Sequence, residues 1–199
     1  MSKNYRNWFL KISPGMRYVV GIVLAQLAVT PVYAQSPGHA YSPVDEGSTI
    51  SFKIKNFGFN TDGTFKGLGG RIVFDPQHVA ADSFDVSIDA ASVNTDNDMR
   101  DDHLRKDSYF DVEKYPKIRL VSTAIVAVDG SGHYRMTGTL TIKGTTKEIT
   151  FPFLATAAGN DYIFKGSFVI NRRDFDVGGT STLGNEVTVS LTVLARSLR

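Results

Sequence analysis

The 199-residue sequence contains no cysteine. This absence excludes a disulfide framework, a thiol nucleophile, an iron–sulfur site and an anchor in which a lipid is attached to cysteine. A chain without such cross-links has to be stabilised by its own apolar core, and a domain of about 165 residues can bury enough surface for that.

Tryptophan is almost absent, and the single Trp8 lies in a segment with the pattern of an export signal. Residues 1–34 contain four basic and no acidic side chains, followed by the apolar run 18–29 and by a sequence, Val-Tyr-Ala, that resembles a cleavage site. The run is shorter than the roughly 20 residues that span a bilayer. The sequence therefore predicts a removable signal peptide over 1–34 and a periplasmic or secreted protein, with an uncleaved anchor as the alternative.

The rest of the chain has no excess of positive charge. The sequence has 22 Lys and Arg against 20 Asp and Glu, and four of the basic residues belong to the predicted leader. The remainder thus has 18 basic and 20 acidic residues, and it has no basic patch interleaved with aromatic side chains. We therefore expect no nucleic-acid partner.

Helical periodicity is scarce after the leader, whereas apolar and polar side chains alternate repeatedly, as in 50–55 and 187–193. Eight such segments, mostly joined by short turns, predict an all-β fold with eight antiparallel strands and one short helical crossing within 90–116. We expect a flexible lead-in over 35–47 and a single domain over 48–196. Such a sheet can close into a barrel that holds one small ligand or form a filled sandwich, and alternation does not show which face is inside.

The motifs of common enzymes and metal sites are missing. The sequence has no G-x-S-x-G elbow, and its four histidines are scattered one per segment, which argues against a metal site. The densest charged stretch is 100–116, which fits a short helix capped by Asp96 or Asp98. It is either a solvated plug at one end of the sheet or the lip of a cavity.

This stretch, R-D-D-H-L-R-K-D-S-Y-F-D-V-E-K-Y-P, resembles the signature of the YceI-like family of exported polyisoprenoid-binding proteins. Segments 138–153, 170–178 and 183–191 are similar to further family motifs, in the same order. The resemblance implies an extended, lipocalin-like barrel with its apolar face inward. It also implies an elongated cavity for an isoprenoid or another long-chain amphiphile, with the head group near the mouth, and neither catalysis nor a cofactor.

The alternation and the resemblance together suggest which residues contact the ligand. The expected wall residues are Phe52, Ile54, Phe57, Phe65, Phe84, Leu140, Phe151 and Phe168. The expected mouth residues are Arg100, His103, Tyr109 and Arg172, although alternation does not distinguish Arg172 from Arg173. The chain departs from the family pattern at Asn56, where a histidine is common, and at Asp176, where glycine is usual. The added negative charge of Asp176 favours an uncharged head group.

The resulting hypothesis is a soluble periplasmic protein that binds a long-chain lipid as a carrier or store. One alternative is an isoprenoid-modifying enzyme with His103 and Asp102 as acid and base. Another is a small outer-membrane barrel, which the scarcity of Trp and Tyr after residue 34 disfavours. The expected partner is the lipid itself, and transient membrane contact and a homodimer remain open.

Overall fold

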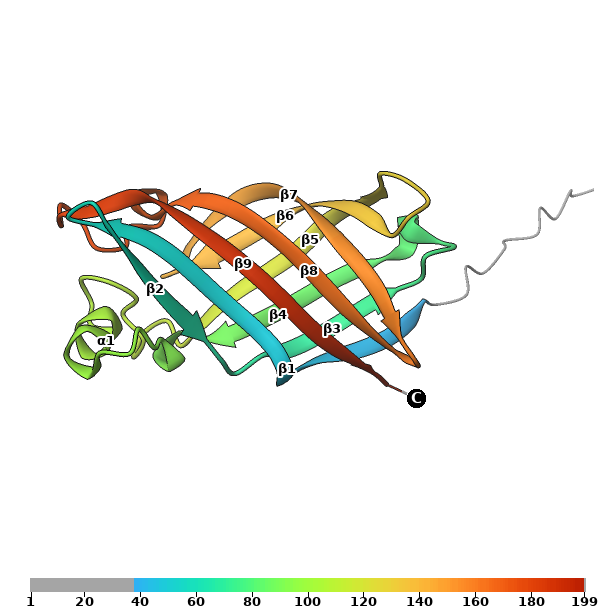
Figure 1. Ribbon diagram of the computed structural model, residues 1–199, viewed down its shortest axis with the longest axis horizontal. Coiled ribbons are helices and arrows are strands. Elements are labelled where there is room, and N and C mark those ends of the chain that lie inside the picture. Colours follow the sequence, from blue (N-terminus) through green and yellow to red (C-terminus); the bar gives the residue numbers. More distant parts are fainter. Residues whose placement is uncertain (1–37, 199) are drawn as a thin grey trace, which may run out of the picture. The chain divides into compact units, whose positions relative to one another are not determined.

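Nine strands form one antiparallel sheet in the computed structural model, which describes residues 38–198 (Figure 1). The strands are β1 (His39–Asn56), β2 (Phe59–Phe65), β3 (Gly69–Phe74), β4 (Ser83–Asp89), β5 (Lys117–Ala127), β6 (His133–Ile142), β7 (Thr145–Ala158), β8 (Asp161–Asn171) and β9 (Leu183–Ser197). Because β1 also pairs with β9, the sheet closes into a barrel. The predicted leader, 1–34, lies outside the described residues.

Strands β2 and β3 together form one side of the barrel, because both pair with β1. β2 pairs with the second half of β1, where Ile50 lies opposite Phe65, and β3 pairs with its beginning, where Tyr41 lies opposite Ile72. At the interruption between β2 and β3, the Asp45 carboxylate accepts hydrogen bonds from the backbone N–H groups of Gly67 and Leu68, each at 3.0 Å. The barrel therefore has eight strands around its circumference, which confirms the predicted fold class.

The flexible lead-in predicted over 35–47 is wrong for residues 39–47, because β1 already begins at His39. Tyr41 is buried and pairs with Ile72 on one side and with Ser197 on the other. The Pro- and Gly-rich composition suggested a loop, but closing the barrel requires a strand between β3 and the end of β9. The sheet consequently spans His39–Ser197 rather than starting at residue 48.

The long connection between β4 and β5 contains the predicted helical crossing, α1 (Asp98–Arg105). Its N-cap is Asn97, whose side chain accepts a hydrogen bond from the backbone N–H of Arg100 at 2.9 Å. The predicted caps, Asp96 and Asp98, were wrong: Asp96 has a left-handed backbone with φ of 57°, and Asp98 is already helical. Figure 1 shows α1 at the same end of the barrel as the turn between β1 and β2.

Aromatic side chains fill the opposite end of the barrel. Phe74 is fully buried, and its ring centroid lies 5.3 Å from Tyr134, 5.0 Å from Tyr162 and 5.2 Å from Phe164, with the rings edge to face. Phe153 stacks on Tyr134 at 5.3 Å. Such edge-to-face and stacked pairs are favourable ring geometries. This aromatic plug leaves the α1 end as the side from which a ligand would reach the interior.

Candidate ligand-binding site

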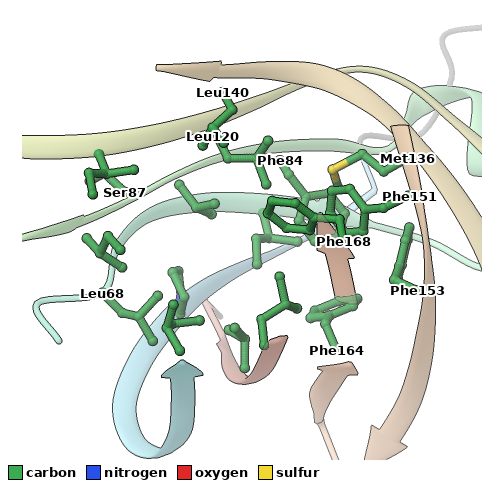
Figure 2. A pocket seen from close by; sticks show the side chains of 18 residues that line it. Leu68, Phe84, Ser87, Leu120, Met136, Leu140, Phe151, Phe153, Phe164 and Phe168 are labelled. Carbon is green, nitrogen blue, oxygen red and sulfur yellow. The ribbon is translucent and has the colours of Figure 1, made fainter. Parts of the chain in front are cut away.

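An apolar cavity of about 120 Å³ lies in the middle of the barrel, and we call it the inner cavity (Figure 2). Its walls are the inward-facing side chains of the strands, among them Ile72, Phe84, Val86, Leu120, Met136, Leu140, Phe151, Phe153, Phe164, Phe168, Leu191 and Val193. Ser87 is the one polar side chain among the described residues that line it. Apolar cavities of about 150 Å³ in other proteins stay dry and bind small hydrocarbons. The inner cavity is therefore suited to an apolar group.

A second cavity of about 260 Å³, the mouth cavity, lies at the α1 end. It is bordered by α1, by the β1–β2 turn and by the loop that follows the short helical turn η3 (Arg172–Phe175). Ile118 lines both cavities, and Phe65 packs against the core clusters around each of them. Unlike the inner cavity, the mouth cavity has several polar side chains, namely Asn56, Thr61, Thr95, Arg100, His103, Tyr109, Arg172, Ser181 and Thr182.

Of the two adjacent arginines, Arg172 is the one that points inward, with 4 % of its surface exposed, whereas Arg173 is exposed. A guanidinium has five N–H donors. Arg172 directs all of them to backbone carbonyls: Nε to Gly184 at 2.9 Å, and the two Nη atoms to carbonyls of Val177, Gly179, Ser181 and Leu183 at 2.7–3.4 Å. Burial lowers the pKa of Arg172. The side chain thus ties the loop after η3 to the start of β9 and has no donor left for a ligand.

A buried polar network attaches α1 to the mouth cavity. The backbone N–H and the hydroxyl of Thr95 both donate to Oδ1 of Asp101, at 2.9 and 2.6 Å. Arg100 donates from Nε to the Thr95 hydroxyl and from Nη2 to the Thr95 carbonyl, each at 2.7 Å. Thr95 and Asp101 are both buried. Asp101 is therefore a structural member of the charged stretch, and Arg100 is partly occupied by the same network.

Ser181 and His103 are among the polar side chains of the mouth cavity that have no hydrogen-bond partner within residues 38–198. The Ser181 hydroxyl is buried and unpaired, and no hydrogen bond of the described residues involves the exposed His103 ring, which lies 6.3 Å from the ring of Tyr109. Buried polar atoms normally have a partner. Ser181 is consequently the group in this cavity that most needs a polar ligand atom.

The structure divides the residues predicted from the sequence between the two cavities. Phe84, Leu140, Phe151 and Phe168 line the inner cavity. Phe52, Ile54, Phe65, Arg100, His103, Tyr109 and Arg172 line the mouth cavity.

Phe57 also borders the mouth cavity, but only at its rim, because it occupies the tip of the β1–β2 turn, where 74 % of its surface is exposed. It follows Ile54 at a spacing that no longer alternates once the chain turns. Sequence reasoning also missed Phe153, Phe164 and Ser181. The first two follow the alternation of their strands and could have been found from it, whereas Ser181 lies in a loop and has no periodic signal.

His103 and Asp102, which were considered as acid and base of an enzyme, both lie at exposed positions of α1. Asp102 is exposed and accepts a hydrogen bond from Arg105 at 2.9 Å, and no hydrogen bond joins it to His103 in the described part of the chain. Residues 38–198 contain no group of three His, Asp or Glu side chains placed to hold a metal ion. Among the helices of these residues, none has the length and apolar character needed to cross a membrane.

The geometry defines a class: a closed, eight-stranded antiparallel barrel with an apolar interior and a polar mouth at one end. Residues 41–195 match the YceI-like domain family, and the chain belongs to this family. A UPF0312 protein of Yersinia pestis (strain Pestoides F) is 32% identical in an alignment of length 185, and the match covers 88% of this chain and 94% of the relative. A UPF0312 protein of Enterobacter sp. (strain 638) is 31% identical in an alignment of length 173, and the match covers 83% of this chain and 88% of that protein.

Solved structures share the barrel. BcnA of Burkholderia cenocepacia has a TM-score of 0.70 at 32% identity, covering 75% of this chain and 96% of its own. The YceI protein of Campylobacter jejuni has a TM-score of 0.65 at 31% identity, covering 71% and 87%. A polyisoprenoid binding domain from Saccharophagus degradans has a TM-score of 0.67 at 17% identity, covering 80% and 99%, and so shares the fold.

Proposed function

We propose that this chain is an exported, periplasmic binding protein that holds an isoprenoid or another long-chain amphiphile, as a carrier or a store. The observation that carries the proposal is the inner cavity, whose lining is apolar apart from Ser87 and which ends in the aromatic plug. A domain of the same fold from Saccharophagus degradans is described as polyisoprenoid-binding, which supports the same class of ligand here. The function is binding, with no catalytic step and no cofactor.

The binding energy comes mainly from the tail of the ligand. Each buried methylene contributes about 0.8 kcal/mol. Ordering the flexible tail and fixing the ligand in place cost a good part of that gain. Because neither term depends strongly on the head group, affinity follows the length of tail that fits between the mouth and the plug, and selectivity among head groups is loose.

The mouth cavity favours an uncharged head group. Arg172 has no free donor for a phosphate, and Thr95 takes two of the five donors of Arg100. The unpaired Ser181 hydroxyl can donate one hydrogen bond and accept others. An alcohol, a quinone carbonyl or an amide satisfies this group without bringing a net charge into the barrel, where it would be costly.

The test is native mass spectrometry of protein purified without detergent from the periplasmic fraction, followed by solvent extraction. The intact mass also shows whether residues 1–34 have been removed. We expect a stoichiometric long-chain adduct in the wild type and its loss in Leu120→Trp, which fills the inner cavity. Val126→Trp is the matched control, because Val126 lies on the same strand and its side chain is 52% exposed. Equal adducts in both variants, or no long-chain lipid in the wild-type extract, would refute the proposal.

A further inference from the structure

The three most exposed large apolar side chains of the described residues all lie at the α1 end of the barrel. Phe57, Phe59 and Met99 are 74%, 78% and 83% exposed. The other exposed large apolar residues, Val126, Val128, Val169 and Leu198, are 48–59% exposed. We call Phe57, Phe59 and Met99 the rim patch. Single exposed apolar residues are ordinary, whereas a group of them beside a cavity marks an interaction surface.

The strained backbone at Phe57 indicates that its aromatic ring contacts something other than the barrel itself. Phe57 and Gly58 form a two-residue turn between the paired residues Asn56 and Phe59, with φ values of 48° and 83°. Both residues are thus left-handed, and hairpin turns of this kind strongly favour Asn or Asp before the glycine. A bulky residue with positive φ is an outlier. Phe57 is unfavourable in the isolated barrel both because its backbone is strained and because its ring faces water.

The rim patch is continuous with the mouth cavity. Phe57 contributes to the lining of that cavity from its rim, and Met99 belongs to α1, whose residues Arg100 and Leu104 line the same cavity. An amphiphile that enters or leaves at this end therefore passes the patch. Because a long-chain amphiphile is held in membranes rather than in water, the surface that meets the patch is the one that holds the ligand.

We propose that the rim patch docks on the surface of a lipid bilayer, so that the amphiphile passes between the bilayer and the mouth cavity; this inference rests on the proposed function. Aromatic and lysine side chains are the usual anchors at a membrane interface. Lys55 adjoins the turn and has no carboxylate within salt-bridge distance among residues 38–198. Asp98 of α1 has the opposite charge at the same end, and Asp102 is paired with Arg105, so the aromatic rings and not anionic lipids dominate the contact.

Fluorescence tests the contact directly. Trp8 is the only tryptophan of the sequence, so Phe59→Trp in a Trp8→Phe background carries one reporter whether or not the leader is removed. Phe59 lines neither cavity. With phosphatidylcholine vesicles, with and without phosphatidylglycerol, we expect its emission to shift to the blue and to be quenched by brominated acyl chains. Val128→Trp, on the opposite end of the barrel, should show neither effect. Equal responses at both positions, or none at position 59, overturn the proposal.

Two further variants separate docking from ligand binding. Phe59→Ser should reduce flotation with vesicles by about tenfold or more, given the apolar area that one Phe buries, and should retain the long-chain adduct in native mass spectrometry. Phe57→Asn should lose vesicle binding and also raise the unfolding temperature, because Asn suits the left-handed turn.

Wild-type flotation of Phe59→Ser overturns docking while leaving the proposed function intact. An absent adduct with intact flotation refutes the proposed function alone. A dimer in sedimentation that Phe59→Ser abolishes, without vesicle binding, assigns the patch to a second copy of the chain and also overturns the proposal.

Discussion

Arg172 shows how a single residue in a predicted mouth position can have a structural role. Its five donors all end on backbone carbonyls of 177–184. Arg172→Met should lower the free energy of unfolding by roughly 2–4 kcal/mol, because several buried carbonyls lose a charged donor. Urea denaturation measures this loss. The neighbouring Arg173→Met is the matched control and should stay within about 0.5 kcal/mol of the wild type, since Arg173 is exposed. Similar losses in both variants would contradict this role.

Asp82 predicts a pH dependence of stability. Its Oδ1 accepts the backbone N–H of Asp75 at 2.7 Å, while Oδ2 is buried without a partner in the described residues. Burial, opposed by that hydrogen bond and reinforced by the charge of Asp75, raises the pKa of Asp82 from 3.8 to about 7. Between these values the unfolded chain releases a proton that the folded protein keeps, so stability falls as the pH rises through this window and stays reduced above it.

Asp82→Asn should remove most of this decline, because the amide imitates the neutral acid. The measurement is the free energy of unfolding as a function of pH, from about pH 4 to above pH 7. The variant should gain on the wild type towards neutral pH and show little advantage near pH 4. Parallel curves for the two proteins would show that Asp82 ionises normally.

At the scale of elements, the attachment of α1 depends on one buried carboxylate. Asp101 accepts both hydrogen bonds of Thr95, whereas the adjacent Asp102 is exposed and pairs with Arg105. Asp101→Ala should destabilise the protein by about 1–3 kcal/mol, since the buried Thr95 N–H loses its acceptor. Hydrogen exchange of residues 98–105 should become faster, and bound lipid should dissociate sooner. Asp102→Ala should change neither rate, and equal exchange in the two variants would rule out the attachment.

The strands were predicted correctly where the sequence alternates locally between apolar and polar residues. They were missed where a segment becomes a strand only by pairing with distant parts of the barrel. The alternation of apolar residues in β4, β6 and β9 made these strands visible in the sequence. The start of β1 at His39 was not visible, because its Pro- and Gly-rich composition resembles a loop and its pairing partners lie in β3 and β9. The exposed position of Phe57 at the rim was not visible for a related reason: period-two alternation ends at a turn, and a phenylalanine is not an expected turn residue.

At the scale of the whole molecule, the aromatic plug should set the length of the tail. Phe153 lines the inner cavity and packs against Tyr134, Phe84 and Phe164. Phe153→Ala should lower the free energy of unfolding by about 3–5 kcal/mol and extend the cavity into the plug. When the protein is offered a mixture of chain lengths, mass spectrometry of the extract should show longer tails than in the wild type. Val128→Ala, an exposed change at the same end, should alter neither property.

The candidate site was predictable in its walls and less so in its chemistry. Inward residues such as Phe84, Leu140 and Phe151 follow strand alternation, and the resemblance to the YceI-like family indicated that this face points inward. The hydrogen-bond partners of the mouth residues could not be predicted from the sequence, because the acceptors of Arg172 are backbone carbonyls that only the folded loop brings together. Ser181 became a candidate only when its hydroxyl proved to be buried without a partner in the described chain.

The sequence by itself determined the all-β class, the eight-strand count, the helical crossing and most of the apolar wall, because these follow from local alternation and turn chemistry. The tertiary structure alone decided where the barrel closes, which end is plugged, and which polar groups remain free at the other end. The physical reason is that burial and hydrogen-bond saturation are properties of residues brought together from distant parts of the chain. Phe74 becomes a plug only among Tyr134, Tyr162 and Phe164, and Arg172 is occupied only because five carbonyls converge on it.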